Sequence, residues 1–246
     1  MRGACLARRP LVLGALAVAC TGLLSSCGGA GATSGSTPAL VAPGAWVVMG
    51  SSSAAGAGAT PGEGWAGSLQ RSVAGRSVDI VNLAQGGTTT YAGLAASSAP
   101  VPNRPPADPA ANIDAALAQA PKLLLVSYPS NDTALGYSAE ETVHNLLAIR
   151  AAALAQGVAV VVLSTQPRAL PQAQRALLPQ IDAALSQAVS PCFVAVREAL
   201  AAPDGTIDAR YDSGDGVHLN DAGHAVIHDS LRNLIDTQRC VRAGPP

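Results

Sequence analysis

Short apolar runs alternate along this chain with longer segments in which apolar residues recur at helical spacing. The runs are rich in Val, Leu and Ala and are only four to seven residues long, which is typical of strands buried on both faces. The runs lie at residues 45–49, 78–83, 122–128, 158–163 and 193–196, and the helical segments lie near residues 65–75, 110–120, 138–156, 173–189 and 221–237. This alternation predicts parallel βαβ units, with helices covering both faces of one five-stranded sheet.

The N-terminus has the composition of an export signal. Three arginines precede an apolar stretch at residues 11–19, which is shorter than a membrane span and fits the apolar region of a signal peptide. Residues 24–27, Leu-Ser-Ser-Cys, resemble a lipobox, the bacterial signal that directs a diacylglycerol onto the cysteine. We therefore expect a lipoprotein signal peptide over residues 1–26 and lipidation of Cys27, with an ordinary secretory signal as the alternative.

Composition sets further bounds on organisation and partners. Residues 28–43 are rich in Gly, Ser and Ala, which is typical of a flexible tether. We expect a lipidated cysteine and tether over residues 27–43, a folded domain over residues 44–241, and a membrane-anchored location in the bacterial cell envelope. Removal of the three leader arginines from 15 basic residues leaves 12 against 16 acidic ones, a net charge of −4, which argues against nucleic acid as a partner.

Cysteine usage agrees with export. Cys5 and Cys20 belong to the expected leader, and Cys192 and Cys240 are the remaining pair in the domain. In an oxidising compartment such a pair commonly forms a disulfide, although two buried thiols are the alternative. The spacing of Cys and His does not match a zinc site, and we expect neither a metal nor another cofactor.

Polar segments follow three of the predicted strands. Residues 50–56 (Gly-Ser-Ser-Ser-Ala-Ala-Gly) come first, residues 82–90 contain two adjacent glycines, and residues 129–132 read Pro-Ser-Asn-Asp. Ligand sites in parallel sheets gather at the carboxyl ends of the strands, so these segments are expected to meet. Each segment alone is more often only a turn or a helix cap.

A fourth polar segment precedes the last predicted helix. Asp215 and His218 lie three residues apart in it, followed by His224. A carboxylate beside an imidazole can orient the ring for proton transfer, and an imidazole titrates near neutral pH. Such a pair also occurs by chance, so it gains weight only from the segments that precede it.

The four segments together, in this order, resemble the SGNH (GDSL-type) hydrolases over residues 45–235. That family carries Gly-Asp-Ser-x-x-x-Gly near its start, an Asn-rich turn with Gly, then Gly-x-Asn-Asp, and Asp-x-x-His near its end. The most specific match is residues 215–227, Asp-Gly-Val-His-Leu-Asn-Asp-Ala-Gly-His-Ala-Val-Ile. The resemblance implies a three-layer α/β/α sandwich of flavodoxin-like type with a five-stranded parallel sheet.

Two positions depart from the family pattern. The aspartate before the nucleophile is replaced by Ser51, and the glycine of the third segment by Pro129. Ser52 is selected as the nucleophile because Gly56 stands four residues after it, whereas neither neighbouring serine has a glycine at that distance. Neither departure removes a group with a chemical role.

The resemblance implies a serine esterase that works through an acyl-enzyme. Ser52 would be the nucleophile, His218 the base and Asp215 the acid that orients the base. The oxyanion hole would consist of the backbone N–H groups of Ser52 and Gly87 and the side-chain amide of Asn131. The expected substrates are small or medium acyl esters, including O-acetylated sugars and short lipid esters.

Other polar residues receive structural interpretations. Asp132 is expected to cap a helix or brace a loop. His224 and His228 have a spacing that could hold a metal, but no carboxylate matches it, so we expect packed or solvated histidines. The competing function is a catalytically inactive envelope lipoprotein that keeps the fold for binding or assembly. A two-lobed solute-binding protein is disfavoured by the length of the chain.

Overall fold

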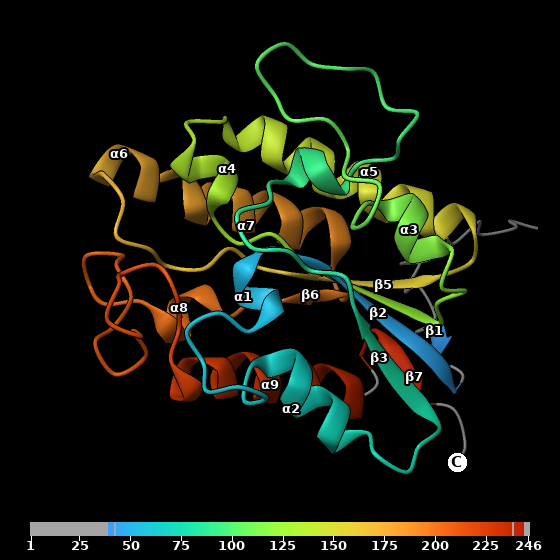
Figure 1. Cartoon of the computed structure of the whole chain (residues 1–246). Helices are drawn as coiled ribbons and strands as arrows, with labels where there is room; N and C mark the ends of the chain where they lie inside the picture. The colour runs from blue at the N-terminus through green and yellow to red at the C-terminus, as the bar shows by residue number, and fades with distance from the viewer. Residues whose placement is uncertain (1–38, 42, 238, 244–246) are drawn as a thin grey trace, which may run out of the picture. The chain divides into compact units, whose positions relative to one another are not determined.

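A five-stranded parallel sheet lies at the centre of the computed structural model, which describes residues 39–41, 43–237 and 239–243 (Figure 1). Its strands are β2 (Gly44–Gly50), β3 (Val78–Asn82), β4 (Leu123–Ser127), β5 (Ala159–Leu163) and β6 (Phe193–Val194). They are ordered β3-β2-β4-β5-β6, and every neighbouring pair is parallel. The strand order reverses between β2 and β4, and the crevice at the carboxyl ends of those strands is where flavodoxin-like folds bind ligands.

Helices cover both faces of the sheet and produce the three predicted layers (Figure 1). On one face lie α2 (Trp65–Ser72) and α9 (Asp221–Asp236), and on the other lie α3 (Ile113–Leu117), α5 (Ala139–Ala155) and α7 (Leu177–Val189). Successive side chains of a strand point to opposite faces. Accordingly, Val48 packs in the core beneath α2 and α9, and Val47 packs in the core beneath α5 and α7.

Three of these helices begin at a polar cap that the sequence supplies. The side chains of Asn112 and Asn220 accept hydrogen bonds from the backbone N–H groups three residues on, at the starts of α3 and α9. Ser138 and Glu141 form a capping box at the start of α5. Each cap satisfies backbone N–H groups that have no partner within the helix. The cap at Asn220 fixes the point where α9 begins, directly after the segment that carries Asp215 and His218.

Two elements differ from the sequence prediction. The helix expected near residues 173–189 is divided into α6 (Gln172–Arg175) and α7, because Pro179 has no N–H to offer to the carbonyl of Arg175. The fifth strand ends at Val194 rather than at residue 196.

The ends of the described chain pair with each other. Strands β1 (Ala39–Val41) and β7 (Val241–Ala243) form a separate two-stranded parallel sheet. The folded part therefore reaches beyond both ends of the predicted domain, residues 44–241. Strand β1 belongs to the predicted tether, and β7 continues past residue 241. The predicted signal peptide and Cys27 lie outside the described residues.

One disulfide closes the C-terminal part of the domain. The sulfur atoms of Cys192, just before β6, and Cys240, just before β7, are 1.95 Å apart. The structure therefore contains the pairing that the sequence predicted. Among the described residues, none of the helices combines the length and the apolar character that crossing a membrane requires.

Candidate active site

The serine predicted as nucleophile lies where the first strand of the sheet turns into a short helix. Ser52 is the first residue of α1 (Ser52–Ala55), and only Ser51 separates it from the carboxyl end of β2. The turn depends on Gly50, because a Cβ at that position would lie 2.2 Å from the carbonyl oxygen of Ser127 on β4. Ser52 is partly exposed, whereas Ser51 and Ser53 are only 1% and 2% exposed. Of the three successive serines, Ser52 alone can meet a substrate.

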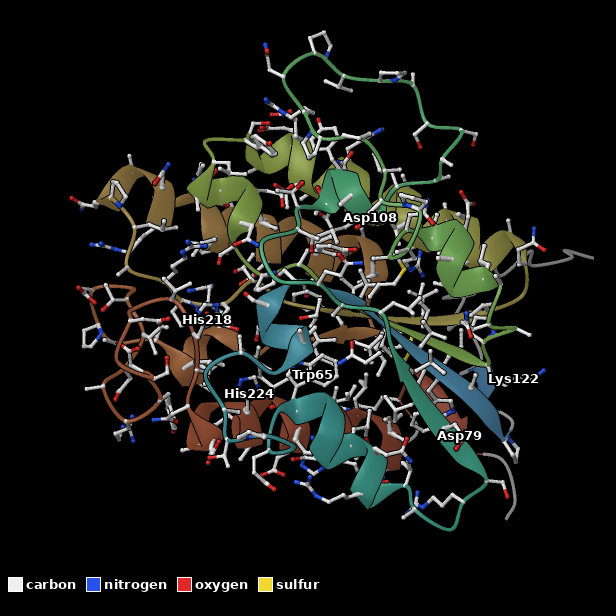
Figure 2. All side chains as sticks on the ribbon, viewed as in Figure 1. Trp65, Asp79, Asp108, Lys122, His218 and His224 are labelled. Carbon is white, nitrogen blue, oxygen red and sulfur yellow. A yellow bond between two sulfur atoms is a disulfide. The ribbon has the colours of Figure 1, made fainter. Side chains whose placement is uncertain are left out.

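An imidazole lies within hydrogen-bonding distance of that hydroxyl. His218 Nε2 is 3.0 Å from Ser52 Oγ, although the two residues are 166 positions apart in the sequence. His218 Nδ1 is 2.7 Å from Asp215 Oδ2. His218 lies in the loop before α9 (Figure 2). The structure thus brings the three predicted side chains into one continuous chain of hydrogen bonds.

The carboxylate of Asp215 is held in place by the loop that carries His218. Its Oδ1 accepts hydrogen bonds from the backbone N–H groups of Val217 and His218, both at 2.8 Å. Burial alone would raise the pKa of Asp215, but the backbone and ring N–H groups of His218 and the N–H of Val217 outweigh it and hold the pKa well below its usual range. Asp215 is therefore ionised at neutral pH, with one oxygen fixed by the backbone and the other facing the imidazole.

The predicted oxyanion-hole residues Gly87 and Asn131 belong to two segments that are joined to each other, and one of these segments lies close to Ser52. Gly87 adopts a φ of +80°, and a Cβ on its neighbour Gly86 would lie 3.9 Å from Ser52 Cβ. Asn131 is the first residue of α4 (Asn131–Ala134), just beyond β4, and its Nδ2 donates to the carbonyl oxygen of Thr88 at 2.8 Å. The side chain of Asn131 is thus joined to the backbone of the glycine turn, and that turn lies close to Ser52.

A segment that the sequence interpretation missed connects these parts. It follows β5, and its Gln166 accepts from Ser53 Oγ at 2.8 Å and donates to the carbonyl of Val217 at 3.2 Å. Two residues further on, Arg168 Nη1 donates to Asn131 Oδ1 at 2.9 Å. The rule that sites gather at strand ends could have pointed to this segment, but Gln and Arg in a loop carry no motif of their own.

The remaining polar residues have structural surroundings. Asp132 is buried and accepts from the backbone N–H of Thr90 at 3.0 Å and from the Thr90 hydroxyl, so it braces the loop after β3 as expected. Burial raises the pKa of Asp132, and the hydrogen bonds from Thr90 partly offset that effect.

His224 is fully buried, and its two ring nitrogens contact the backbone N–H of Trp65 and the carbonyl of Ala57. Figure 2 shows His224 and Trp65 on neighbouring elements.

His228 contacts the carboxylate of Asp229 at 2.9 Å. In the part of the chain that the structure describes, His, Cys, Asp and Glu side chains do not gather into a group of three that could bind a metal ion.

A cavity of about 660 Å³ opens beside Gly86 and Gly87. Its other walls come from the Pro-rich loop at residues 105–109 and from the region around α4, and they include Ala92, Leu135 and Tyr137. The Pro-rich loop is fixed by Arg104, whose guanidinium lies 3.9 Å from the ring centre of Tyr137 and 2.7 Å from the Glu141 carboxylate. A largely apolar pocket therefore borders the glycine turn that contains Gly87, one of the predicted oxyanion-hole residues.

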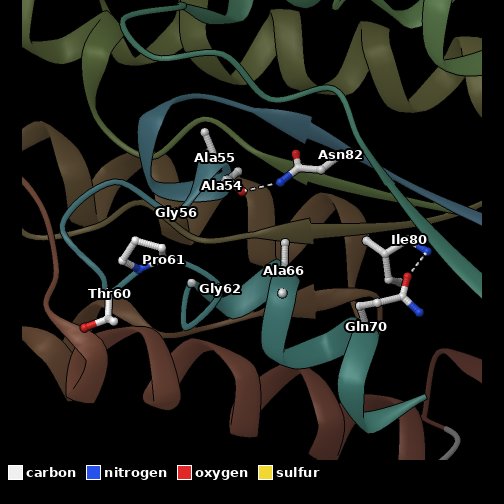
Figure 3. Close-up of a pocket in the computed structure, with 12 residues that line it drawn as sticks. Ala54, Ala55, Gly56, Thr60, Pro61, Gly62, Ala66, Gln70, Ile80 and Asn82 are labelled. Atoms are coloured by element: carbon white, nitrogen blue, oxygen red, sulfur yellow. Dashed lines mark hydrogen bonds between the residues drawn. The ribbon is translucent and has the colours of Figure 1, made fainter. Parts of the chain in front are cut away.

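A second cavity, of about 390 Å³, lies between α1, α2 and β3 (Figure 3). Its polar side chains are already engaged: Asn82 donates to the Ala54 carbonyl, and Gln70 accepts from the Ile80 N–H. None of the residues that line it is titratable. This cavity therefore contains no side chain that could act as an acid or a base.

Sequence comparison gives the class of this protein. The pattern of the GDSL-like lipase/acylhydrolase family matches residues 48–226, and the chain belongs to this family. It is a carboxylic-ester hydrolase, as the resemblance implied. A search of curated proteins finds no match.

Several solved structures of esterases and lipases have a similar fold. A GDSL-like lipase from Bacteroides thetaiotaomicron is 18% identical, with a TM-score of 0.56 over 78% of this chain and 88% of that one. The psychrotrophic esterase EstA from Pseudoalteromonas sp. is 17% identical, with a TM-score of 0.55 over 77% and 95%. A two-domain esterase active on acetylated mannans is 17% identical, with a TM-score of 0.54 over 83% of this chain and 51% of that one. These likenesses establish the shared α/β fold.

Proposed function

We propose that this esterase works through a Ser52–His218–Asp215 triad and a covalent acyl-enzyme. His218 Nε2 accepts the proton of Ser52 Oγ as that oxygen attacks the carbonyl carbon of the ester. His218 then donates the proton to the departing alkoxide, and water releases the acid in a second round of the same steps. The 3.0 Å distance between Ser52 Oγ and His218 Nε2 is the single observation that carries this proposal.

Asp215 sets the tautomer of His218. Its carboxylate is acceptor-only, so the ring nitrogen that faces it must carry a proton, and Nε2 is left free to accept one from Ser52. Once the ring is protonated, the same carboxylate stabilises the imidazolium.

The developing oxyanion receives hydrogen bonds from the backbone N–H groups of Ser52 and Gly87 and from Asn131 Nδ2. The first two belong to the turn after β2 and the glycine turn after β3, which approach closely at Ser52 and Gly86. Donors that are already in place cost no reorganisation when the charge forms.

The proposed substrates are esters with a small or medium acyl group, including acetylated sugars. The cavity beside Gly86 and Gly87 has a volume in the range of small-molecule sites, and its walls are mainly apolar. One protein of similar fold is an esterase active on acetylated mannans. Initial rates on p-nitrophenyl esters from acetate to dodecanoate, and on acetylated sugars, test this range. A maximum at the longest chain would contradict it.

The nucleophile is tested by comparing Ser52→Ala with Ser51→Ala and Ser53→Ala on p-nitrophenyl acetate. We expect Ser52→Ala to reduce kcat to the uncatalysed background, whereas the other two variants remain active because those hydroxyls are buried. Wild-type turnover by Ser52→Ala would exclude this mechanism. A well-folded wild type that neither turns over nor reacts with a fluorophosphonate would instead favour a binding or assembly role.

We also propose that the protein is held at the bacterial envelope by a lipid on Cys27, which follows an export signal at residues 1–26. The three leader arginines, the short apolar stretch and the Leu-Ser-Ser-Cys sequence support this. Fractionation of cells that express the full chain tests the anchor. Wild type should sediment with membranes and Cys27→Ser should not, whereas equal sedimentation of both would refute lipidation at this residue.

A further inference from the structure

The side-chain amide of Asn131 is held at both of its ends. Its Nδ2 donates one hydrogen to the carbonyl oxygen of Thr88 at 2.8 Å, and its Oδ1 accepts from Arg168 Nη1 at 2.9 Å. An amide nitrogen has two hydrogens, so one remains for a further acceptor. Because a guanidinium only donates and a carbonyl only accepts, rotating the amide by 180° would break both contacts. The orientation of Asn131 is therefore fixed.

We propose that Arg168 is a positioning residue for ester hydrolysis, which acts through Asn131 by aiming and polarising the amide that donates to the oxyanion. This inference rests on the proposed role of Asn131 in the oxyanion hole. Arg168 donates to that amide, and its hydrogen bonds within the described part of the chain do not include Ser52 or His218.

The charge of Arg168 makes the Asn131 amide a stronger hydrogen-bond donor, in addition to orienting it. Hydrogen bonds with an ionised partner are about twice as strong as neutral ones, and successive hydrogen bonds polarise each other. A cation on Oδ1 draws electron density from the amide and makes its remaining N–H a better donor as negative charge develops. This gain is larger in the transition state than in the ground state, so it raises kcat.

The surroundings of Arg168 are consistent with a functional cation. Burial lowers the pKa of its guanidinium, and the nearby Asp215 carboxylate raises it, so the cation lies within the field of the proposed triad. The guanidinium stays charged at any working pH, because arginine does not lose its proton in proteins.

The backbone that carries Arg168 is tied to the other catalytic segments. The N–H of the next residue, Ala169, donates to the carbonyl of Gly216, in the loop that carries His218, at 2.7 Å. Gln166 forms hydrogen bonds with Ser53, in the turn after β2, and with Val217, in the loop that carries His218. The guanidinium therefore has a defined position relative to Ser52, His218 and Asn131.

A double-mutant cycle tests the proposal on the full chain, with p-nitrophenyl acetate as substrate. Arg168→Met alone should lower kcat about tenfold to hundredfold, the range for one hydrogen bond to a charged group, with KM changed by less than about twofold. In an Asn131→Ala background, the same substitution should lower kcat by less than about threefold, because its route of action is already gone. Arg168→Lys, which keeps a charge and a donor, should recover part of the lost rate.

Three results would overturn the proposal. Equal losses in both backgrounds would show that Arg168 does not act through Asn131. A raised KM with unchanged kcat would show that it binds substrate. A loss matched by a lower melting temperature, and by an equal loss in Arg168→Lys, would show a structural role. If Arg168→Met does not fold, the cycle is run with Arg168→Lys instead. An equal loss of kcat from Arg168→Lys in the wild-type and Asn131→Ala backgrounds would then refute the proposal.

A control variant at another arginine, and the effect of Asn131→Ala alone, separate the role of Arg168 from that of Asn131. Arg232→Met removes a guanidinium of low exposure that pairs with Asp236 on α9, away from the site, and should leave kcat unchanged. If Asn131→Ala leaves kcat/KM at the wild-type value, the proposed oxyanion role of Asn131 fails. If Asn131→Ala is slow but the cycle is additive, only the role of Arg168 fails.

Discussion

Replacing Asp215 by Asn changes a single atom of the proposed triad, and the structure predicts which atom it is. Oδ1 of Asp215 accepts from the backbone N–H groups of Val217 and His218, so an asparagine must keep its oxygen there. Its NH2 group then takes the place of Oδ2 and faces His218 Nδ1, which is 2.7 Å away in the native protein. A donor at that position requires Nδ1 to be unprotonated, so the ring carries its proton on Nε2 and cannot accept one from Ser52.

The magnitude follows from the two functions that are lost together. The wrong tautomer removes the base, and the missing charge no longer stabilises the imidazolium. The same change in the triad of serine proteases lowers kcat about 10⁴-fold, or about 5.4 kcal/mol of transition-state stabilisation. We expect a loss of about 10³ to 10⁴ here, because Asp215 is half-exposed and water can partly compensate. The melting temperature should change little, since both backbone hydrogen bonds are kept.

Steady-state hydrolysis of p-nitrophenyl acetate and a melting curve measure the two quantities on one sample. Asp212→Asn is the matched control: Asp212 lies in the same loop and accepts from the N–H groups of Gly214 and Gly216, and its hydrogen bonds do not include the imidazole. It should keep at least about a third of the wild-type kcat, as expected for a change outside the reacting groups. If Asp215→Asn kept more than a tenth of wild-type kcat, the tautomer argument would be refuted.

Two further predictions concern stability. Replacing both Cys192 and Cys240 by Ala should lower the free energy of unfolding by about 4 kcal/mol, from the 48-residue sequence separation that the disulfide closes, without changing kcat at 25 °C; a urea melt that matches that of wild type would contradict it. Burial lowers the pKa of His224, so the folded state binds its proton less readily than the unfolded state, and stability should fall as the pH drops below the unfolded value of about 6.5. The drop in melting temperature between pH 7.5 and 5.5 should therefore be smaller in His224→Gln than in wild type, and equal drops would exclude this cause.

The fold could be predicted from the sequence because its central strands, β2, β4 and β5, are largely buried on both faces. Such strands appear as short apolar runs. Four of the five strands lie within the expected ranges, and β2 extends one residue beyond its range at each end. The division of the helix near residues 173–189 has a local cause in Pro179, which the sequence contains but the helical spacing hides. The pairing of residues 39–41 with residues 241–243 is a contact across almost the whole chain, and no local pattern indicates it.

The candidate site could be predicted only in part, because some of its residues belong to no sequence motif. Ser52, Asp215 and His218 belong to segments with recognisable order and spacing, and the structure joins them by hydrogen bonds. Gln166 and Arg168 lie in a loop after β5, where a glutamine and an arginine are ordinary surface residues by sequence. Their meaning arises from tertiary contacts with Ser53 and Asn131, which are more than thirty residues away along the chain.

Peptide mapping after reaction with a fluorophosphonate tests the central claim most directly, because three serines stand side by side in the turn after β2. Fragmentation of the labelled peptide should place the phosphonate on Ser52 alone, since Ser51 and Ser53 are buried. Ser52→Ala should take up no label, and Asp215→Asn should react slowly at Ser52. A phosphonate found on Ser51 or Ser53, or full labelling of Ser52→Ala, would contradict the triad proposed here.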